Sequence, residues 1–399
     1  MTSLSQTLNQ NKRIIKLLIY IALALFAAVV LSNLLAGQRP YRLVQSTITG
    51  LLIGGIYALI ALGIVIINKA SGVFNFAHGW MMLIGGLIFY AIFIAASGER
   101  VTPLAAFGLS GVMLFMAVTT NSWKALKAPR TWIIIVVGTL ILGGALQVGG
   151  SELQIPRAIL GAVIGAAITG LVIERFAIRP LLGQPLFATV LMTLAVSEAI
   201  HGITQMIWGS VEIPLGVFAG ISQLGIPSPM RIDGGEILDG TIIINTPLLV
   251  AFVLALVAFG AFVLFFRFTN VGLAMRATAE NQKLAQTTGL RVRTILAVAW
   301  AIAALLATTA GVLQGGATTL SLNLPLLALR AFPAVLLGGL ESISGAFIGG
   351  LVIGLVQEWA NLLFPGTQAG TELAPYVVLM LVLVLRPDGL FGQKRIERI

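Results

Sequence analysis

Long runs of apolar residues recur along almost the whole chain, separated by short polar stretches. The runs are mostly close to 20 residues long and do not alternate, which favours membrane-spanning helices over the roughly ten-residue alternating strands of a barrel. We therefore predict an all-α polytopic membrane protein with about 10–12 transmembrane helices. The expected apolar segments are residues 17–36, 43–67, 74–97, 103–120, 131–148, 157–173, 186–208, 246–266, 294–314, 329–340, 345–363 and 372–386.

Small residues recur at a spacing of four inside several of these segments, for example at Gly50 and Gly54 and at Gly350 and Gly354. Such spacing lets two helix backbones approach closely, which matters in lipid because no hydrophobic force drives helices together. Two Gly-interrupted regions, 50–63 and 338–354, could also be corresponding broken helices of an inverted-repeat core.

Basic residues are distributed unequally between the two sides of the predicted bundle. If the N-terminus is inside, 18 of the 24 Lys and Arg residues lie on the cytoplasmic side and 6 lie outside. This bias predicts a multi-pass protein with both termini in the cytoplasm. The longest outer loop, 209–245, is rich in turn residues and ends in the β-branched run 241–244, so we expect a small extracellular hairpin there on which a soluble partner could dock.

Composition supports the membrane assignment and narrows the chemistry. Of the 399 residues, 58% are hydrophobic and 10% are charged, whereas a soluble domain has about half and a quarter. The chain has no Cys and only two His, so we expect no metal site. It also lacks a phosphate-binding G-x-x-x-x-G-K-[ST] loop, a G-x-S-x-G nucleophile elbow and an H-E-x-x-H pair. We therefore expect no enzyme activity, no catalytic residues, no cofactor held by this chain and no nucleic-acid partner.

Segment 186–208 carries a stripe of polar side chains in an otherwise apolar helix. Glu198, His201 and Gln205 belong to this stripe, which covers about 140° of the helix circumference. Ionisable groups within a bilayer are costly and often line a transport path. The segment ends at Trp208, a residue typical of the membrane interface, so the stripe either lines a pathway or is simply hydrated.

The stretch "SGVFNFAHGW", residues 71–80, places Asn75 and His78 between two apolar runs. It follows Asn68 and Lys69, which predicts a position at the cytoplasmic face. Asn75 and His78 are three positions apart and would share one face of a helix. They are candidates either for polar packing near an inner gate or for lining the exit path.

The cytoplasmic loop 267–293 carries five basic residues and one Glu, and its middle predicts a short helix. Thr278 could cap the start of this helix, and Gly289 suits the left-handed position at its end. Leu284 and Ala285 form an apolar side. Such a helix could press into a groove on a motor protein or lie on anionic lipid headgroups.

Five motifs in register give the chain a family resemblance: "NFAHG" at 75–79, "ERFAIRPL" at 174–181, "GLAMRATAENQKLAQTTGL" at 272–290, "AFPAVLLGGLESISGAFIGGLVIGLVQ" at 331–357 and "RPDGLFG" at 386–392. Together they resemble the LivH-like inner-membrane permeases of branched-chain amino acid ABC importers, whose relatives import urea and short amides. Residues 98–156 depart from this pattern and look like an inserted transmembrane hairpin. The resulting division is 1–42, 43–97, the insertion 98–156, and 157–399 with its loops 209–245 and 267–293.

The resemblance implies a set of partners and a coupling site. The expected partners are a second related permease subunit, two cytoplasmic ATPase subunits that bind ATP and Mg, an extracytoplasmic solute-binding protein and membrane lipid. The cytoplasmic helix would enter a groove of the ATPase. The residues that match this coupling helix are Ala277, Glu280, Asn281, Leu284, Ala285 and Gly289.

The function that follows is that of a permease subunit moving branched-chain or other hydrophobic amino acids across the inner membrane at the expense of ATP. A urea or short-chain amide importer permease is the alternative within the same class. An ion-coupled secondary transporter is more distant, because it would need a relay of intramembrane carboxylates.

Overall fold

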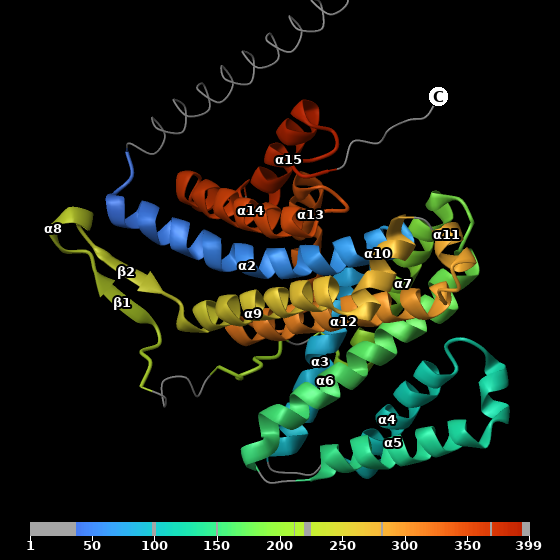
Figure 1. Cartoon of the computed structure of the whole chain (residues 1–399). Coiled ribbons are helices and arrows are strands. Elements are labelled where there is room, and N and C mark those ends of the chain that lie inside the picture. The colour runs from blue at the N-terminus through green and yellow to red at the C-terminus, as the bar shows by residue number, and fades with distance from the viewer. Residues whose placement is uncertain are drawn as a thin grey trace, which may run out of the picture.

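The computed structural model describes residues 37–97, 101–148, 151–210, 212–218, 225–280, 282–367 and 369–392. The first expected segment, 17–36, lies outside these residues. The described chain is almost entirely helical (Figure 1). Its main helices are α2 (Pro40–Ser71), α3 (His78–Ser97), α4 (Pro103–Val118), α5 (Pro129–Gln147), α6 (Gln154–Val172), α7 (Leu186–Trp208), α9 (Thr246–Phe268), α10 (Asn270–Glu280), α11 (Gln282–Thr287), α12 (Val292–Ala317), α13 (Leu324–Gly338), α14 (Ile343–Leu363) and α15 (Ala374–Leu385).

Within the described residues, eight helices are long and apolar enough to cross a membrane, and α4, α13 and α15 are shorter apolar helices. These helices confirm the all-α polytopic fold and agree with the expected number of segments. The tenth expected segment was placed at 329–340, but its helix α13 begins earlier, at Leu324.

Helix α2 is the centre of the fold. Its 32 residues span about 48 Å, longer than the roughly 30 Å hydrocarbon core of a bilayer. Every residue from Gly54 to Ile67 is buried, because α9, α12, α13 and α14 all pack around this helix. An evenly apolar helix with no polar face is therefore explained by burial on all sides.

The predicted small-residue contacts are confirmed where α2 crosses α14. A Cβ atom added to Gly350 would lie 2.4 Å from the backbone nitrogen of Ala58, and one added to Gly354 would lie 2.4 Å from the carbonyl oxygen of Gly50. Only glycine permits this approach. The Gly-rich regions 50–63 and 338–354 therefore pack against each other.

A different correspondence relates the two halves of the bundle. In this correspondence α2 is equivalent to α12, α3 to α13 and α6 to α14. Each contact in the first half then has an equivalent in the second: α2–α14 matches α12–α6, α2–α13 matches α12–α3, and α3–α6 matches α13–α14. The α2–α12 and α3–α13 contacts join equivalent helices. Both α2 and α12 are followed by a non-helical segment, 72–77 and 318–323 respectively. The core is thus an inverted repeat with broken helices.

The hairpin of α4 and α5 lies at the edge of the bundle (Figure 1). A π-helical turn after α6, Ile173–Ile178 (η3), fastens it to the core. Arg175 donates to the Thr119 hydroxyl at 2.7 Å and stacks 4.0 Å from the Trp123 ring. Arg179 pairs with the buried carboxylate of Glu174 at 2.6 Å. The "ERFAIRPL" motif therefore anchors this hairpin.

The loop between α7 and α9 contains the expected small hairpin. Strands β1 (Met230–Asp233) and β2 (Thr241–Ile244) pair antiparallel, with Met230 opposite Ile244, and the short helix α8 (Gly235–Leu238) joins them. This hairpin and the α10–α11 turn lie at opposite ends of the bundle (Figure 1).

Candidate translocation pathway and coupling surface

The segment between α2 and α3 turns back into the protein. Gly72 adopts the left-handed conformation that ends α2, with φ of 70°, and its N–H donates to the Asn68 carbonyl. His78, six residues later, already lies beside Gly63. Gly63 is eight residues before the end of α2, which is about 12 Å along the helix axis. The stretch therefore re-enters the bundle directly after the end of α2.

Aromatic packing and one threonine hold this re-entrant segment. The rings of Phe74 and Phe76 lie 5.3 Å and 5.2 Å from the ring of Phe332 on α13. The hydroxyl of Thr193, on α7, donates to the Phe74 carbonyl at 3.1 Å and accepts from the Phe76 N–H at 3.4 Å. Helices α7 and α13 thus both contact the segment 72–77.

Asn75 and His78 are both fully buried but have different surroundings. Asn75 lies before the helix, where its side-chain oxygen accepts from the Ala77 N–H at 3.1 Å and its amide contacts the Met81 sulfur. The prediction that Asn75 and His78 share a helical face is wrong, because α3 begins only at His78. Neither ring nitrogen of His78 has a hydrogen-bond partner among the described residues.

The polar stripe on α7 divides into two parts. Thr193, Ser197 and Thr204 are buried against the bundle, whereas Glu198 and Gln205 are exposed. His201 lies between them, with its Nδ1 atom 3.3 Å from Glu198 Oε2. The structure thus brings Glu198 and His201 together but leaves Gln205 outside this pair.

The ring of His201 stacks on Trp80 of α3 at a centroid distance of 4.1 Å. Trp80 is only two residues beyond His78, so α3 connects the two groups of candidates. The exposed remainder of α7 is apolar and includes Leu191, Ile203 and Met206. This helix therefore presents both a polar pair and an apolar face to its surroundings.

The turn between α9 and α12 is built from two short helices, α10 and α11. Thr278 does not cap a helix, because it is buried within α10 and donates to the Ala274 carbonyl. Thr269 caps α10 instead, since its hydroxyl accepts from the Gly272 N–H at 3.0 Å. Gly289 has φ of 86° and ends α11, as predicted.

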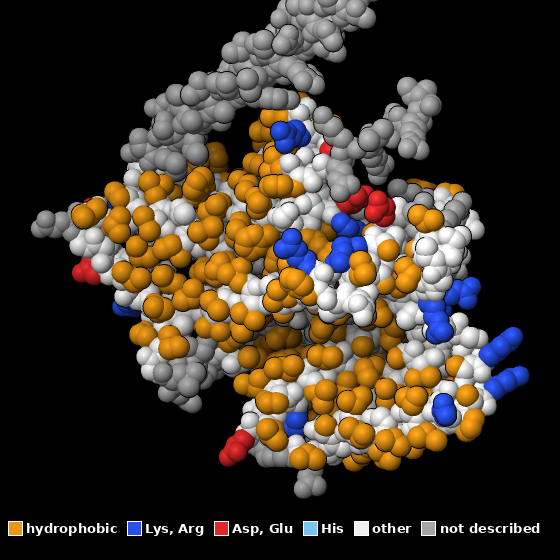
Figure 2. Space-filling model, in the orientation of Figure 1, with side chains coloured by type: hydrophobic (Ala, Val, Ile, Leu, Met, Phe, Trp, Pro, Cys, Tyr) orange, Lys and Arg blue, Asp and Glu red, His pale blue; other side chains and the backbone are white. Residues whose placement is uncertain are grey.

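The residues that were expected to form a coupling helix are mostly exposed, and one of them is buried. Ala277, Glu280, Leu284 and Gly289 are exposed, and Ala285 is 4% exposed and belongs to the main core. Asn281 lies outside the described residues. Figure 2 shows the visible Lys and Arg side chains mainly toward the half of the molecule that carries α10 and α11.

A polar cluster that the sequence analysis did not anticipate joins α2 to α14. The hydroxyl of the fully buried Tyr57 donates to the Gln357 side-chain oxygen at 2.5 Å. Gln357 and Asn361 both donate to Glu358 Oε1, at 3.3 Å and 3.1 Å. Arg330 of α13 lies within electrostatic range of the Tyr57 hydroxyl. The polar residues of α14 were visible in the sequence, but their partners were not.

Glu358 also lines a hollow of about 560 Å³ between the start of α2 and the end of α14. Arg42 and Gln45 lie on the α2 side of this hollow and Asn361 on the α14 side. A guanidinium and a carboxylate in one hollow are the groups that can receive the carboxylate and ammonium of a zwitterion. Among the described residues, no three His, Cys, Asp or Glu side chains gather as a metal site requires.

Comparison with known proteins identifies the family of the chain. Residues 46–385 match the family described as "Branched-chain amino acid transport system / permease component". The permease protein LivH of the high-affinity branched-chain amino acid transport system of Salmonella typhimurium is 26% identical over 359 residues, which cover 89% of this chain and 97% of LivH.

Two further relatives agree. The permease protein BraD of the corresponding system of Pseudomonas aeruginosa is 28% identical over 90% of this chain and 99% of BraD. A probable branched-chain amino acid transport permease protein LivH of Methanocaldococcus jannaschii is 28% identical over 60% of this chain and 75% of its own length. No solved structure matches the chain. The match over residues 46–385 shows that this chain belongs to the family of branched-chain amino acid transport system permease components.

Proposed function

We propose that this chain is the membrane-spanning permease subunit of an ATP-driven ABC importer for branched-chain and other hydrophobic amino acids. The observation that carries this proposal is the family match over residues 46–385, together with relatives of that name that align over nearly their full length. The hollow that holds Arg42 and Glu358 supports a zwitterionic substrate rather than a neutral amide such as urea.

The chain has surfaces suited to each proposed partner. The exposed apolar faces of α7 and α15, which include Met206, Met380 and Val384, suit a second permease subunit that packs closely against them in the membrane. Leu273 and Leu284 suit a groove on an ATPase subunit. The outer hairpin suits an extracytoplasmic binding protein. ATP and Mg would bind to the two ATPase subunits, and the chain would lie in the inner membrane with both termini in the cytoplasm.

The architecture supports a mechanism for coupling. Ala285 and Met275 of the α10–α11 turn are buried in the same core as α2 and α12, so a force on this turn reaches the centre of the bundle. The re-entrant segment 72–77 contacts both α7 and α13. Closure of the ATPases would tilt the two halves of the repeat against each other at this segment and alternate the access of the pathway.

The pairing of intramembrane carboxylates favours this mechanism over ion-coupled transport. Glu174 is neutralised by Arg179, and Glu358 accepts hydrogen bonds from side-chain amides. The Glu198 carboxylate is exposed at the surface of α7. Among the described residues, these groups do not form the chain of carboxylates that a proton or cation relay needs.

Uptake by the reconstituted complex tests the proposal. The permease, its companion permease, two ATPases and the binding protein would be placed in proteoliposomes with radiolabelled leucine, urea or acetamide. We expect leucine uptake that requires Mg-ATP and the binding protein. Uptake of urea but not leucine would indicate that the chain is instead a permease of an amide importer. Uptake driven by an ion gradient without ATP would refute it.

A further inference from the structure

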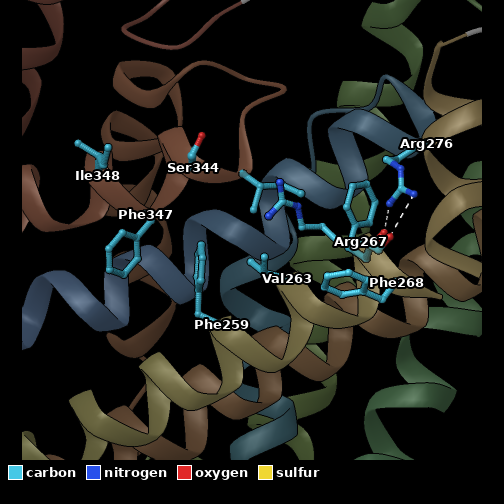
Figure 3. Close-up of a pocket in the computed structure, with 10 residues that line it drawn as sticks. Phe259, Val263, Arg267, Phe268, Arg276, Ser344, Phe347 and Ile348 are labelled. Carbon is cyan, nitrogen blue, oxygen red and sulfur yellow. Dashed lines mark hydrogen bonds between the residues drawn. The ribbon is translucent and has the colours of Figure 1, made fainter.

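A large cleft separates α9 and α14 near the cytoplasmic turn (Figure 3). Its volume is about 910 Å³, and most of its wall is apolar. Phe259 from α9 and Phe347 from α14 line it and contact each other, with ring centroids 5.1 Å apart. The exposed ring of Phe268 lies at one end of the cleft. Both walls are helices long and apolar enough to cross a membrane, so a lipid is an occupant suited to this cleft.

Basic groups lie at the end of the cleft next to α10. Arg276 is committed to the protein, since it donates to the carbonyl oxygens of Phe266 and Arg267 and stacks on the Phe266 ring. Arg267 is different, because its guanidinium has no hydrogen-bond or ion-pair partner within the described residues. In Figure 3 this guanidinium reaches into the space between the two helices, toward the side that carries Ser344.

We propose that this cleft binds an anionic phospholipid of the cytoplasmic leaflet. One acyl chain lies along the apolar wall that Phe259 and Phe347 help to form, and the phosphate binds Arg267 with the Ser344 hydroxyl as a second donor. Arg276 adds a positive charge at the same end. Basic pockets between transmembrane helices on the cytoplasmic side are recognised sites for anionic headgroups. An unpaired arginine above an apolar cleft complements a lipid that has a charged head and an apolar tail.

The site adjoins the α10–α11 turn but does not depend on its role in transport. Arg276 belongs to α10, and the carbonyl groups to which it donates are at the end of α9. A bound lipid would therefore stiffen the corner from which the cytoplasmic turn projects. Its binding can be measured on the complete permease without ATP, transport substrate or partner subunits.

Lipid-selective quenching tests this proposal directly. The chain has no native Cys, so Ile348→Cys gives a single attachment point for a bimane fluorophore in the cleft wall. The labelled permease would be reconstituted in phosphatidylcholine containing a small fraction of brominated phosphatidylglycerol or brominated phosphatidylcholine. We expect stronger quenching by the brominated anionic lipid. Arg267→Gln should weaken that preference about fivefold, which corresponds to about 1 kcal/mol for one basic residue.

The matched control is Arg130→Gln, since Arg130 is an exposed basic residue at the start of α5, away from the cleft. It should leave the preference unchanged. Equal effects of Arg267→Gln and Arg130→Gln would mean general surface attraction and overturn the proposal, as would no effect of Arg267→Gln. Quenching by neither lipid, together with cross-linking of Ile348→Cys to a second permease chain, would assign the cleft to a subunit interface instead. Circular dichroism would confirm that each variant is folded.

Discussion

The contact between α2 and α14 predicts a sharp penalty for adding a single methyl group. In Gly350→Ala the new Cβ atom would lie 2.4 Å from the Ala58 nitrogen and 2.5 Å from its Cα atom. Ordinary contact begins near 3.4 Å, so α14 must move by about 1 Å away from α2. These neighbours are backbone atoms, which cannot rotate away. Overpacking of this kind costs about 1–3 kcal/mol.

Alanine also stabilises a helix relative to glycine by about 0.5–1 kcal/mol, which offsets part of this cost. We therefore expect Gly350→Ala to lower the free energy of unfolding by about 1–2 kcal/mol. The assay is unfolding of the purified permease in mixed micelles with increasing dodecyl sulfate, followed by circular dichroism. Gly144→Ala on α5 is the control, because a Cβ atom there meets no atom within 4 Å. Equal stabilities of the two variants would refute the packing argument.

Three further predictions concern the re-entrant segment, the pair on α7 and the α10–α11 turn. Thr193→Val removes the hydroxyl that binds the backbone of 72–77, and we expect a loss of about 1 kcal/mol in unfolding free energy and slower leucine uptake. Glu198→Gln removes an exposed pair that adds little stability, so we expect normal unfolding but altered uptake kinetics. Glu280→Trp adds bulk to the exposed turn, and we expect normal membrane insertion but loss of substrate-stimulated ATPase activity.

Each of these predictions has a contrary result. Thr309→Val is the control for Thr193→Val, because within the described part of the chain the Thr309 hydroxyl bonds only to the Leu305 carbonyl of its own helix. Equal uptake by these two variants would remove Thr193 from the mechanism. Normal uptake by Glu198→Gln would mean that Glu198 does not line the pathway and only packs at the membrane interface. Unchanged coupling in Glu280→Trp would argue against the α10–α11 turn as the ATPase contact.

Sequence patterns predicted the elements of this protein well and their contacts poorly. The Gly50–Gly54 and Gly350–Gly354 spacings indicated close packing, and the structure pairs them with each other. Sequence alone could not choose the partner, because every small-residue motif has the same geometry until the helices are arranged. The two halves of the repeat were recognised because α2 and α12 have equivalent sets of neighbouring helices. Similar glycine patterns did not identify them.

Local signals near helix ends were reliable when they depended on backbone conformation alone. Gly289 ends α11 in the left-handed region, as its position suggested. Thr278 was misassigned because Thr269 offers an equally good cap nine residues earlier and begins a longer helix. The capping preference of threonine does not reveal which of two threonines is at a helix start.

By itself the sequence determined that this is a polytopic helical membrane protein, and its motifs indicated the family. The physical reason is local: in hydrocarbon, each apolar segment must satisfy its own backbone hydrogen bonds, and a helix does so without help from the rest of the chain. Only the tertiary structure decided which polar groups meet. Phe76 and Thr193 are 117 residues apart, and Tyr57 and Gln357 are 300 apart. The depth of segment 72–77, the split stripe on α7 and the α9–α14 cleft all follow from such distant contacts, which depend on how the helices pack together.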